Sequence, residues 1–381
     1  MKKILAILLA GIILLCAVSC GEKKENNNNK EETDPVVQNS IEEAGNNGKF
    51  QFDTDDKGDY VITSYEPYSS TPVDITLPAE VNKRDIVGIA EGAFKAIYSI
   101  KSVAIPSTYT YIENYAFYDC DSLESITLPS SIEEIGIGAF ESCDSLASVT
   151  LSTALETIPE YAFKDCSAIT SIDASNVKSI KKGAFFNCSA LETLTLSNDL
   201  QYATKEAFYG CEKLAYTESE NALYLGNESN ATLLLVSPKT LNETECKVSA
   251  STKVIADSAF INCKYLEALT LSDSIIGVNG TAFTGCDALK YNENENGLYL
   301  GSEANPYLVL IKLDVKSVED FSVNEKAKII VDNAFVGCPS IKDISFAGTA
   351  DAWKAIIKTE DWNNDLTINV ICADQTVTVL G

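Results

Sequence analysis

The chain has 381 residues, a net charge of −26 and no histidine. So negative a surface repels phosphate backbones and anionic headgroups, which argues against nucleic acid as a partner. The lack of histidine removes the Ser-His-Asp and Cys-His catalytic arrangements and the commonest metal ligand. Carboxylates remain, but any acidic protein has many of them, so their presence does not indicate catalysis. We therefore expect no enzyme activity, no metal site and no cofactor.

Residues 1–19 have the layout of a secretion signal. Two lysines precede an apolar run from Ile4 to Val18, which is too short to span a bilayer comfortably. The end of the run and the two residues after it read AVSC (17–20), which resembles a bacterial lipobox, where cleavage precedes a cysteine that is then acylated. We interpret 1–19 as a lipoprotein signal peptide and Cys20 as the lipid attachment site. The alternative is an ordinary cleaved signal with a coincidental cysteine.

Residues 20–49 are predicted to be a disordered tether. The segment is rich in Asn, Glu and Lys and has few apolar side chains. Such a composition cannot bury enough surface to offset the entropy lost on ordering. A lipid, a tether and then a folded body describe a secreted protein held at a bacterial outer membrane or cell surface.

The folded body is expected to begin with a capping hairpin at 49–65. Its middle, DTDDKGD (53–59), has acidic residues at spacings that resemble a calcium-binding loop. However, Lys57 stands where a ligand belongs and Ser64 replaces the closing glutamate, so the motif fails twice. We therefore interpret 53–59 as a hairpin turn.

An Ala-Phe motif then recurs nine times, and in eight copies a cysteine follows the phenylalanine by three residues. The spacings are 22 or 23 residues, with two of 52. A regular period of this length is the signature of a stacked repeat architecture. The repeat core residues are Phe94, Phe117, Phe140, Phe163, Phe185, Phe208, Phe260, Phe283 and Phe335, with Cys120, Cys143, Cys166, Cys188, Cys211, Cys263, Cys286 and Cys338.

One unit reads LESITLPSSIEEIGIGAFESC (123–143). Its first part alternates, so Ile126 and Leu128 are expected to face inward and Thr127 outward on a short strand. The proline that follows closes the strand because it cannot donate to a ladder. A second short extended stretch comes next. The phenylalanine, the cysteine and a later leucine are spaced by three, which fits one helical turn.

This repeat resembles the BspA-like, or treponemal-type, leucine-rich repeat, and the resemblance covers about 60–346. It implies a mainly β repeat solenoid with short strands and short helical turns. It also implies an interaction scaffold, sometimes an adhesin, and not an enzyme. Proteins of this family are typically bacterial lipoproteins or surface proteins. We place the solenoid at 50–346.

The two long spacings each contain an insert, at about 215–243 and 290–318. Within them, NALYLGNESNATLLLV (221–236) and NGLYLGSEANPYLVLI (296–311) align at an offset of 75. Apolar arms around a polar loop predict a β-hairpin, laid against the solenoid. The last segment, 347–381, leaves the repeat pattern and holds both tryptophans. We interpret it as a C-terminal cap.

The repeat cysteines are predicted to be buried free thiols. They occupy one site in successive units, and side chains that point in parallel directions suit a disulfide poorly. Cys246 and Cys372 lie outside this row, and whether they pair is left open. Four of the cysteines follow Asp119, Asp165, Asn187 and Asn262, whose side chains are expected to accept backbone hydrogen bonds at the turn.

The outward residues of the leading strands form the candidate binding face, comprising Thr127, Thr150, Asp173, Thr195, Thr270 and Ser345. Threonine also favours exposed strands for its own sake, so a purely structural reading stays open. The expected ligand is a protein or glycan at the cell surface. Exposed aromatic residues would favour a glycan-binding module, but the repeated Tyr224 and Tyr299 are expected to be buried. A periplasm-facing outer-membrane scaffold is the other alternative.

Overall fold

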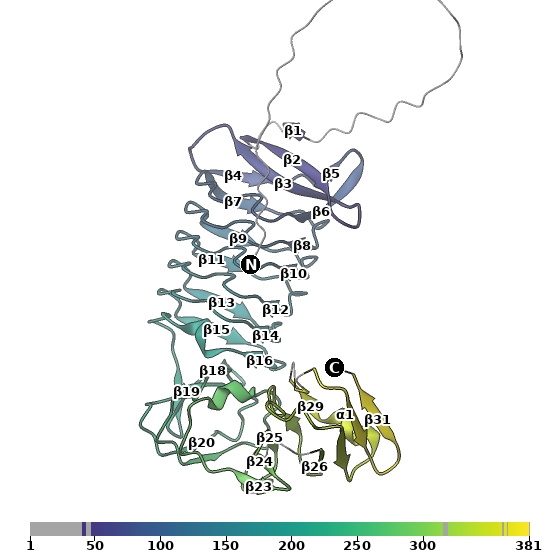
Figure 1. Ribbon diagram of the computed structural model, residues 1–381. Coiled ribbons are helices and arrows are strands. Elements are labelled where there is room, and N and C mark those ends of the chain that lie inside the picture. The colour runs from purple at the N-terminus through teal and green to yellow at the C-terminus, as the bar shows by residue number, and fades with distance from the viewer. Residues whose placement is uncertain (1–39, 43–46, 315–318, 360–361, 364, 381) are drawn as a thin grey trace, which may run out of the picture. The chain divides into compact units, whose positions relative to one another are not determined.

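The computed structural model describes residues 40–42, 47–314, 319–359, 362–363 and 365–380. These residues belong to one compact unit that spans 38–381. The predicted signal peptide and Cys20 lie outside the described residues, as does most of the predicted tether. The described part forms successive coils of short strands (Figure 1). The expectation of a mainly β repeat solenoid is confirmed.

The leading strand of each coil pairs in parallel with its neighbours to form the first ladder. One sheet of this ladder has the order β11-β9-β7-β4, and another pairs β13 with β15. These strands are β4 (Val73–Thr76), β7 (Ile100–Ala104), β9 (Ser125–Thr127), β11 (Ser148–Thr150), β13 (Ser171–Ala174) and β15 (Thr193–Leu196). Farther along the chain it continues with β20 (Glu245–Lys247), β22 (Ala268–Thr270), β26 (Asp320–Val323) and β28 (Asp343–Phe346).

The second extended stretch of each coil forms the second ladder. Its strands are β6 (Arg84–Ile89), β8 (Tyr111–Ile112), β10 (Glu134–Ile135), β12 (Thr157–Ile158), β14 (Ser179–Ile180) and β16 (Tyr202–Ala203). Ile112 pairs with Ile135, and Ile158 pairs with Ile180. The isoleucines of this ladder face the interior because every second residue of a strand points to the same side.

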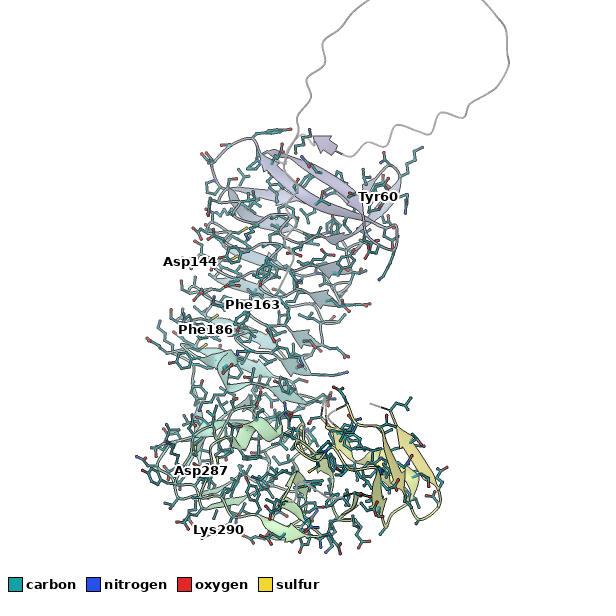
Figure 2. The ribbon with its side chains drawn as sticks, viewed as in Figure 1. Tyr60, Asp144, Phe163, Phe186, Asp287 and Lys290 are labelled. Carbon is teal, nitrogen blue, oxygen red and sulfur yellow. The ribbon has the colours of Figure 1, made fainter. Side chains whose placement is uncertain are left out.

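The Ala-Phe-x-x-Cys segments form a third line of contact between coils, which we call the turn edge. The Phe140 N–H donates to the carbonyl of Ala162 at 2.9 Å, and the Phe163 N–H donates to that of Ala184 at 2.9 Å. The rings stack from coil to coil, with Phe117 and Phe140 5.3 Å apart at the ring centroids. Phe163 lies in this stack and is fully buried (Figure 2).

The predicted helical turn is regular in two units only, as the 3-10 helices η1 (Lys205–Phe208) and η2 (Gly280–Phe283). In the other units the residue two places before the phenylalanine has a positive φ, between 55° and 64°. These residues are Gly92, Tyr115, Gly138, Tyr161, Gly183, Ser258 and Asn333. A left-handed residue interrupts a right-handed helix, so these turns stay irregular.

The two inserts have the same architecture. The first contains β17 (Thr217–Ser219), β18 (Ala222–Asn227) and β19 (Asn230–Pro238), and the second contains β23 (Asn292–Asn294), β24 (Gly297–Leu300) and β25 (Val309–Leu313). The hairpins form as predicted, but they are not merely laid against the solenoid. β19 pairs in parallel with β21 (Val254–Ile255), and β25 pairs with β27 (Ile329–Ile330). β21 and β27 are the second extended stretches of their coils and so belong to the second ladder, which makes the second arm of each hairpin a strand of that ladder.

The N-terminal end is covered by β2 (Gly48–Thr54) and β3 (Tyr60–Pro67), an antiparallel hairpin whose second strand pairs with β6. A short strand, β5 (Glu80–Val81), also pairs with β6. The prediction of a disordered tether at 20–49 is wrong at its C-terminal end. There β1 (Ser40–Glu42) pairs with β2, and Gly48 already belongs to β2.

The C-terminal end contains α1 (Ala350–Ala355), β29 (Ile357–Lys358), β30 (Ile368–Ile371) and β31 (Thr376–Val379). Trp353 and Trp362 are buried with their ring centroids 5.8 Å apart, and Trp362 also lies 5.8 Å from Phe335. The aromatic rings thus cover the last repeat phenylalanine. In the described ranges, the helices are too short and too polar to cross a membrane.

Candidate binding surfaces

The predicted binding face lies along the first ladder. Thr127 and Thr150 are exposed and stand opposite each other in the register of β9 and β11. Asp173 and Thr195 are likewise exposed and opposite each other in β13 and β15. The structure therefore brings these four residues together in two adjacent pairs, and β11 contacts β13.

The remaining two predicted residues lie on separate sheets. Thr270 is half-buried and pairs with Lys247, while Ser345 is exposed and pairs with Ser322 on one side and Ile371 on the other. Strand β18 of the first insert contacts β15, so the insert lies next to the strand that carries Thr195. The continuous part of the face is limited to the four residues from Thr127 to Thr195.

A second row of hydroxyl groups runs beside the first. Ser102, Ser125 and Ser148 pair in register on β7, β9 and β11, and the Ser102 hydroxyl donates to Asp74 at 2.6 Å. Small hydroxyls donate and accept hydrogen bonds without a net charge. The face therefore offers a polar, shallow surface suited to contact over several coils.

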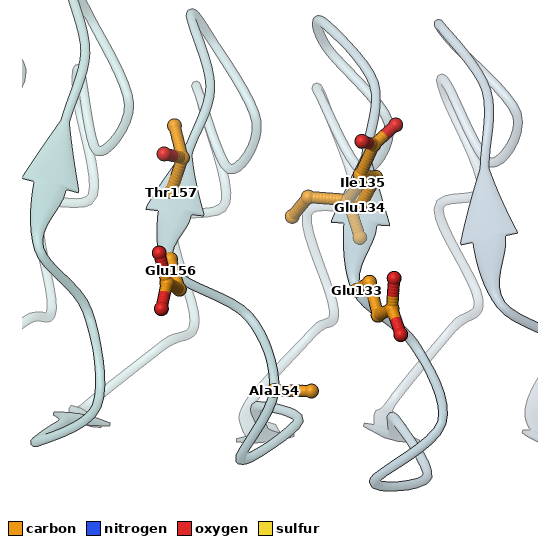
Figure 3. A pocket seen from close by; sticks show the side chains of 6 residues that line it. All are labelled: Glu133, Glu134, Ile135, Ala154, Glu156 and Thr157. Carbon is orange, nitrogen blue, oxygen red and sulfur yellow. The ribbon is translucent and has the colours of Figure 1, made fainter.

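A hollow on the second ladder was not predicted. It has a volume of about 720 Å³ and lies between β10, which ends one sheet, and β12, which begins the next. Figure 3 shows Glu133, Glu134 and Glu156 on the two adjacent coils that line it. The Glu156 carboxylate accepts a hydrogen bond from Lys178 at 2.5 Å. The interruption of the ladder opens this space, and nothing in the repeat pattern marks the interruption.

The repeat cysteines are buried and form no disulfide, as predicted, and the same holds for Cys246 and Cys372, which do not pair. Each of several thiols donates to a phenylalanine carbonyl of the preceding coil. The Cys143 thiol reaches the Phe117 carbonyl at 3.1 Å, and the Cys166 thiol reaches that of Phe140 at 3.0 Å. These thiols are structural, because their hydrogen bonds link successive coils in the interior.

The polar residues before the cysteines have a different role from the one predicted. Asp119, Asp165, Asn187 and Asn262 have φ between 58° and 61°, in the left-handed region where Asn, Asp and Gly are tolerated best. Three of them make hydrogen bonds between side chains: the Tyr98 hydroxyl donates to Asp119, and the Asn187 amide donates to Asp165. The backbone conformation explains the choice of residue at this position.

The DTDDKGD segment forms the turn between β2 and β3, as predicted. The Asp55 carboxylate accepts backbone hydrogen bonds from Lys57 and Asp59 and a third from the Tyr111 hydroxyl at 2.8 Å. One carboxylate oxygen thus accepts hydrogen bonds within the turn, and the other accepts one from Tyr111 of β8. Among the residues that the structure describes, no group of three or more Cys, Asp and Glu is placed to hold a metal ion.

The turn edge carries a pair of aromatic residues, the exposed Tyr209 and the half-buried Phe186, that the sequence reasoning overlooked. Phe186 and Tyr209 occupy the same place in adjacent units, one residue after the repeat phenylalanine, and their rings stack with centroids 5.5 Å apart. Tyr224 and Tyr299, by contrast, are fully buried, as predicted. An alignment of the repeats shows an aromatic residue at this position in both units, so the pair could have been found from the sequence.

Two parallel ladders joined by a buried phenylalanine stack define a leucine-rich repeat solenoid, a class that typically serves as a non-catalytic binding scaffold. The family model of the BspA type leucine rich repeat region matches residues 87–215 and 239–354, in six copies. This chain belongs to that family. Such repeats form a protein-interaction module.

Several solved structures are similar to this chain. A leucine rich cell surface protein from Faecalibacterium prausnitzii is 22% identical, with 85% of this chain and 98% of that chain covered and a TM-score of 0.41. The leucine rich repeat protein of T. pallidum is 23% identical, covering 63% and 88%, with a TM-score of 0.35. The pneumococcal vaccine antigen PcpA is 19% identical, covering 82% of each chain, with a TM-score of 0.35. No curated protein matches this chain significantly in sequence.

Proposed function

We propose that this chain is a lipid-anchored protein of the bacterial cell surface that binds a host or matrix macromolecule through its first ladder. The observation that carries the proposal is the paired register of Thr127 with Thr150 and of Asp173 with Thr195, all exposed. An extended row of small polar groups on a rigid stack suits recognition spread over several coils. The membership in a family of interaction repeats supports the same reading.

The anchor is proposed at Cys20, after a signal peptide at 1–19. The support is the apolar run that ends in a lipobox-like cysteine, followed by a polar tether. A Cys20→Ala variant should move from the detergent phase to the aqueous phase on detergent partitioning. A variant that stays with the detergent would remove the lipoprotein part of the proposal.

The binding face is tested by replacing Thr127, Thr150 and Thr195 with lysines while the buried Ile126 and Leu194 stay in place. The matched control places three lysines at Ser145, Ser167 and Ser189, which are exposed beside the turn-edge cysteines. Both triple variants change the net charge equally. Only the first should lose adhesion to host cells or matrix, and equal adhesion by a folded first variant would exclude this face.

Exposure on the cell is tested by protease treatment of intact cells. A surface protein should be cleaved, whereas a periplasm-facing scaffold of the outer membrane should be cleaved only after the membrane is opened. Protection in intact cells, together with no retained host ligand, would favour the periplasmic scaffold.

A further inference from the structure

A small pocket on the turn edge is built from three aromatic rings and one ion pair. It has a volume of about 290 Å³ and is lined by Tyr161, Lys182, Gly183, Phe186, Glu206 and Tyr209. Small-molecule sites ordinarily have volumes of about 300–1,000 Å³, so this one fits a single ring-sized group. The residues come from three successive coils, because stacking places equivalent positions side by side.

The aromatic wall is held in place from both sides. Phe186 and Tyr209 stack with an interplanar angle of 20°, and Tyr209 is 67% exposed. The ring of Tyr161 lies over the backbone of Gly183, where a Cβ atom would come within 2.5 Å of it. Gly183 has a φ of 64°, so both its conformation and this close approach require glycine.

The polar rim of the pocket is electrically balanced. The Lys182 ammonium lies 3.3 Å from the Glu206 carboxylate, and both side chains are about half exposed. The ammonium disfavours a cationic guest in the pocket. The carboxylate, together with a net charge of −26 on the chain, disfavours an anionic one. Charge complementarity therefore selects an uncharged ligand.

We propose that this pocket binds a neutral sugar ring of a glycan. A pyranose has an apolar face of C–H groups that packs on aromatic rings and a rim of hydroxyls that hydrogen-bonds to charged groups. Tyr161, Phe186 and Tyr209 supply the apolar surface, while Lys182 donates to hydroxyl oxygens and Glu206 accepts from hydroxyls. The site lies on the turn edge and does not depend on the proposed ligand of the first ladder.

The probe is a panel of neutral oligosaccharides, namely maltohexaose, cellohexaose and mannohexaose, titrated into the folded chain by calorimetry. At least one should bind, and Tyr209→Ala should weaken that binding by about tenfold, the loss of one aromatic contact. Tyr209→Phe, which keeps the ring, should bind within about threefold of the parent, a difference well under 1 kcal/mol.

The matched control is Tyr265→Ala, because Tyr265 is 61% exposed in another coil and does not line the pocket. It should leave the affinity unchanged, and equal losses for the two alanine variants would overturn the proposal. Binding of none of the three glycans by the parent would also overturn it. So would preferential binding of a polyproline peptide or of choline, the other guests that aromatic pockets take. Unchanged thermal unfolding of the Tyr209 variants shows that they remain folded.

Discussion

The rings of Phe140 and Phe163 lie face to face, with centroids 5.4 Å apart and planes within 4° of parallel. Both are fully buried, and the next ring, Phe185, lies 5.8 Å beyond Phe163. Each phenylalanine therefore contacts the coil before it and the coil after it. Through these ring contacts the stack makes the interiors of neighbouring units one continuous core.

Replacing Phe163 with alanine should lower the free energy of unfolding by about 3–5 kcal/mol, because it removes a buried aromatic ring between two others. Thr150→Ala, on the exposed row, should cost less than about 1 kcal/mol. Urea denaturation measures both. Equal costs would mean that the strand faces are assigned the wrong way round.

The left-handed turn residues give a second prediction. Gly183→Ala should cost more than Gly337→Ala, because a Cβ at 183 would meet the Tyr161 ring, whereas at 337 no atom lies within 4 Å. Both have a positive φ, so Gly337→Ala reports the conformational cost alone, about 1–2 kcal/mol.

Adding Tyr161→Ala to Gly183→Ala should remove part of the extra cost of Gly183→Ala, because the ring that the new Cβ meets is gone. A double-mutant cycle of the unfolding free energies of the parent, the two single variants and the double variant measures that coupling. If the two positions respond independently, the close approach of ring and backbone does not limit residue 183.

The buried thiols predict a loss of stability at alkaline pH. Burial raises the pKa of the Cys211 and Cys246 thiols to about 12, and it also raises that of Cys143. In the unfolded chain thiols ionise near pH 8.5, well below that value. Above that pH the folded state holds protons that the unfolded state has lost. The contribution of these thiols to the free energy of unfolding should therefore be constant below about pH 8 and fall as pH rises toward 12.

Urea midpoints at about pH 7.5 and about pH 10 measure this loss. The double variant Cys211→Ala and Cys246→Ala separates the thiols from the tyrosines, which also titrate in the upper part of the range. Its midpoint should fall less between the two pH values than the parent's. An equal fall in parent and variant would show that these thiols do not carry the effect.

The equivalence of the two inserts predicts matching responses. The Tyr224 hydroxyl accepts a hydrogen bond from the Ser249 N–H at 3.2 Å, and the Tyr299 hydroxyl accepts one from the Asn324 N–H at 3.1 Å. Tyr→Phe at either position should cost about 1 kcal/mol, because it leaves one backbone donor without its acceptor.

The Ser249 amide should exchange faster only in Tyr224→Phe, and the Asn324 amide should exchange faster only in Tyr299→Phe. Faster exchange at both amides in one variant would mean that the inserts do not act separately.

Much of the architecture was predictable because it is periodic. A strand alternation such as Ile126-Thr127-Leu128 decides which side chains face the interior, and stacking is the way in which such a unit buries its apolar side. The repeated cysteine likewise predicted a buried, unpaired thiol. The threonine row and its exposure also followed from alternation, but its role in binding stays a prediction.

Stacking, burial and strand faces were thus determined by the sequence itself, because each depends on residues close along the chain or on one repeated period. The tertiary structure alone decided what depends on contacts between coils. It placed β19 and β25 as strands of the second ladder, opened the hollow between β10 and β12, and set Tyr161 against Gly183. These features rest on the register between neighbouring coils and on left-handed turn residues. A period in the sequence specifies which residues are equivalent, but not how closely their backbones approach.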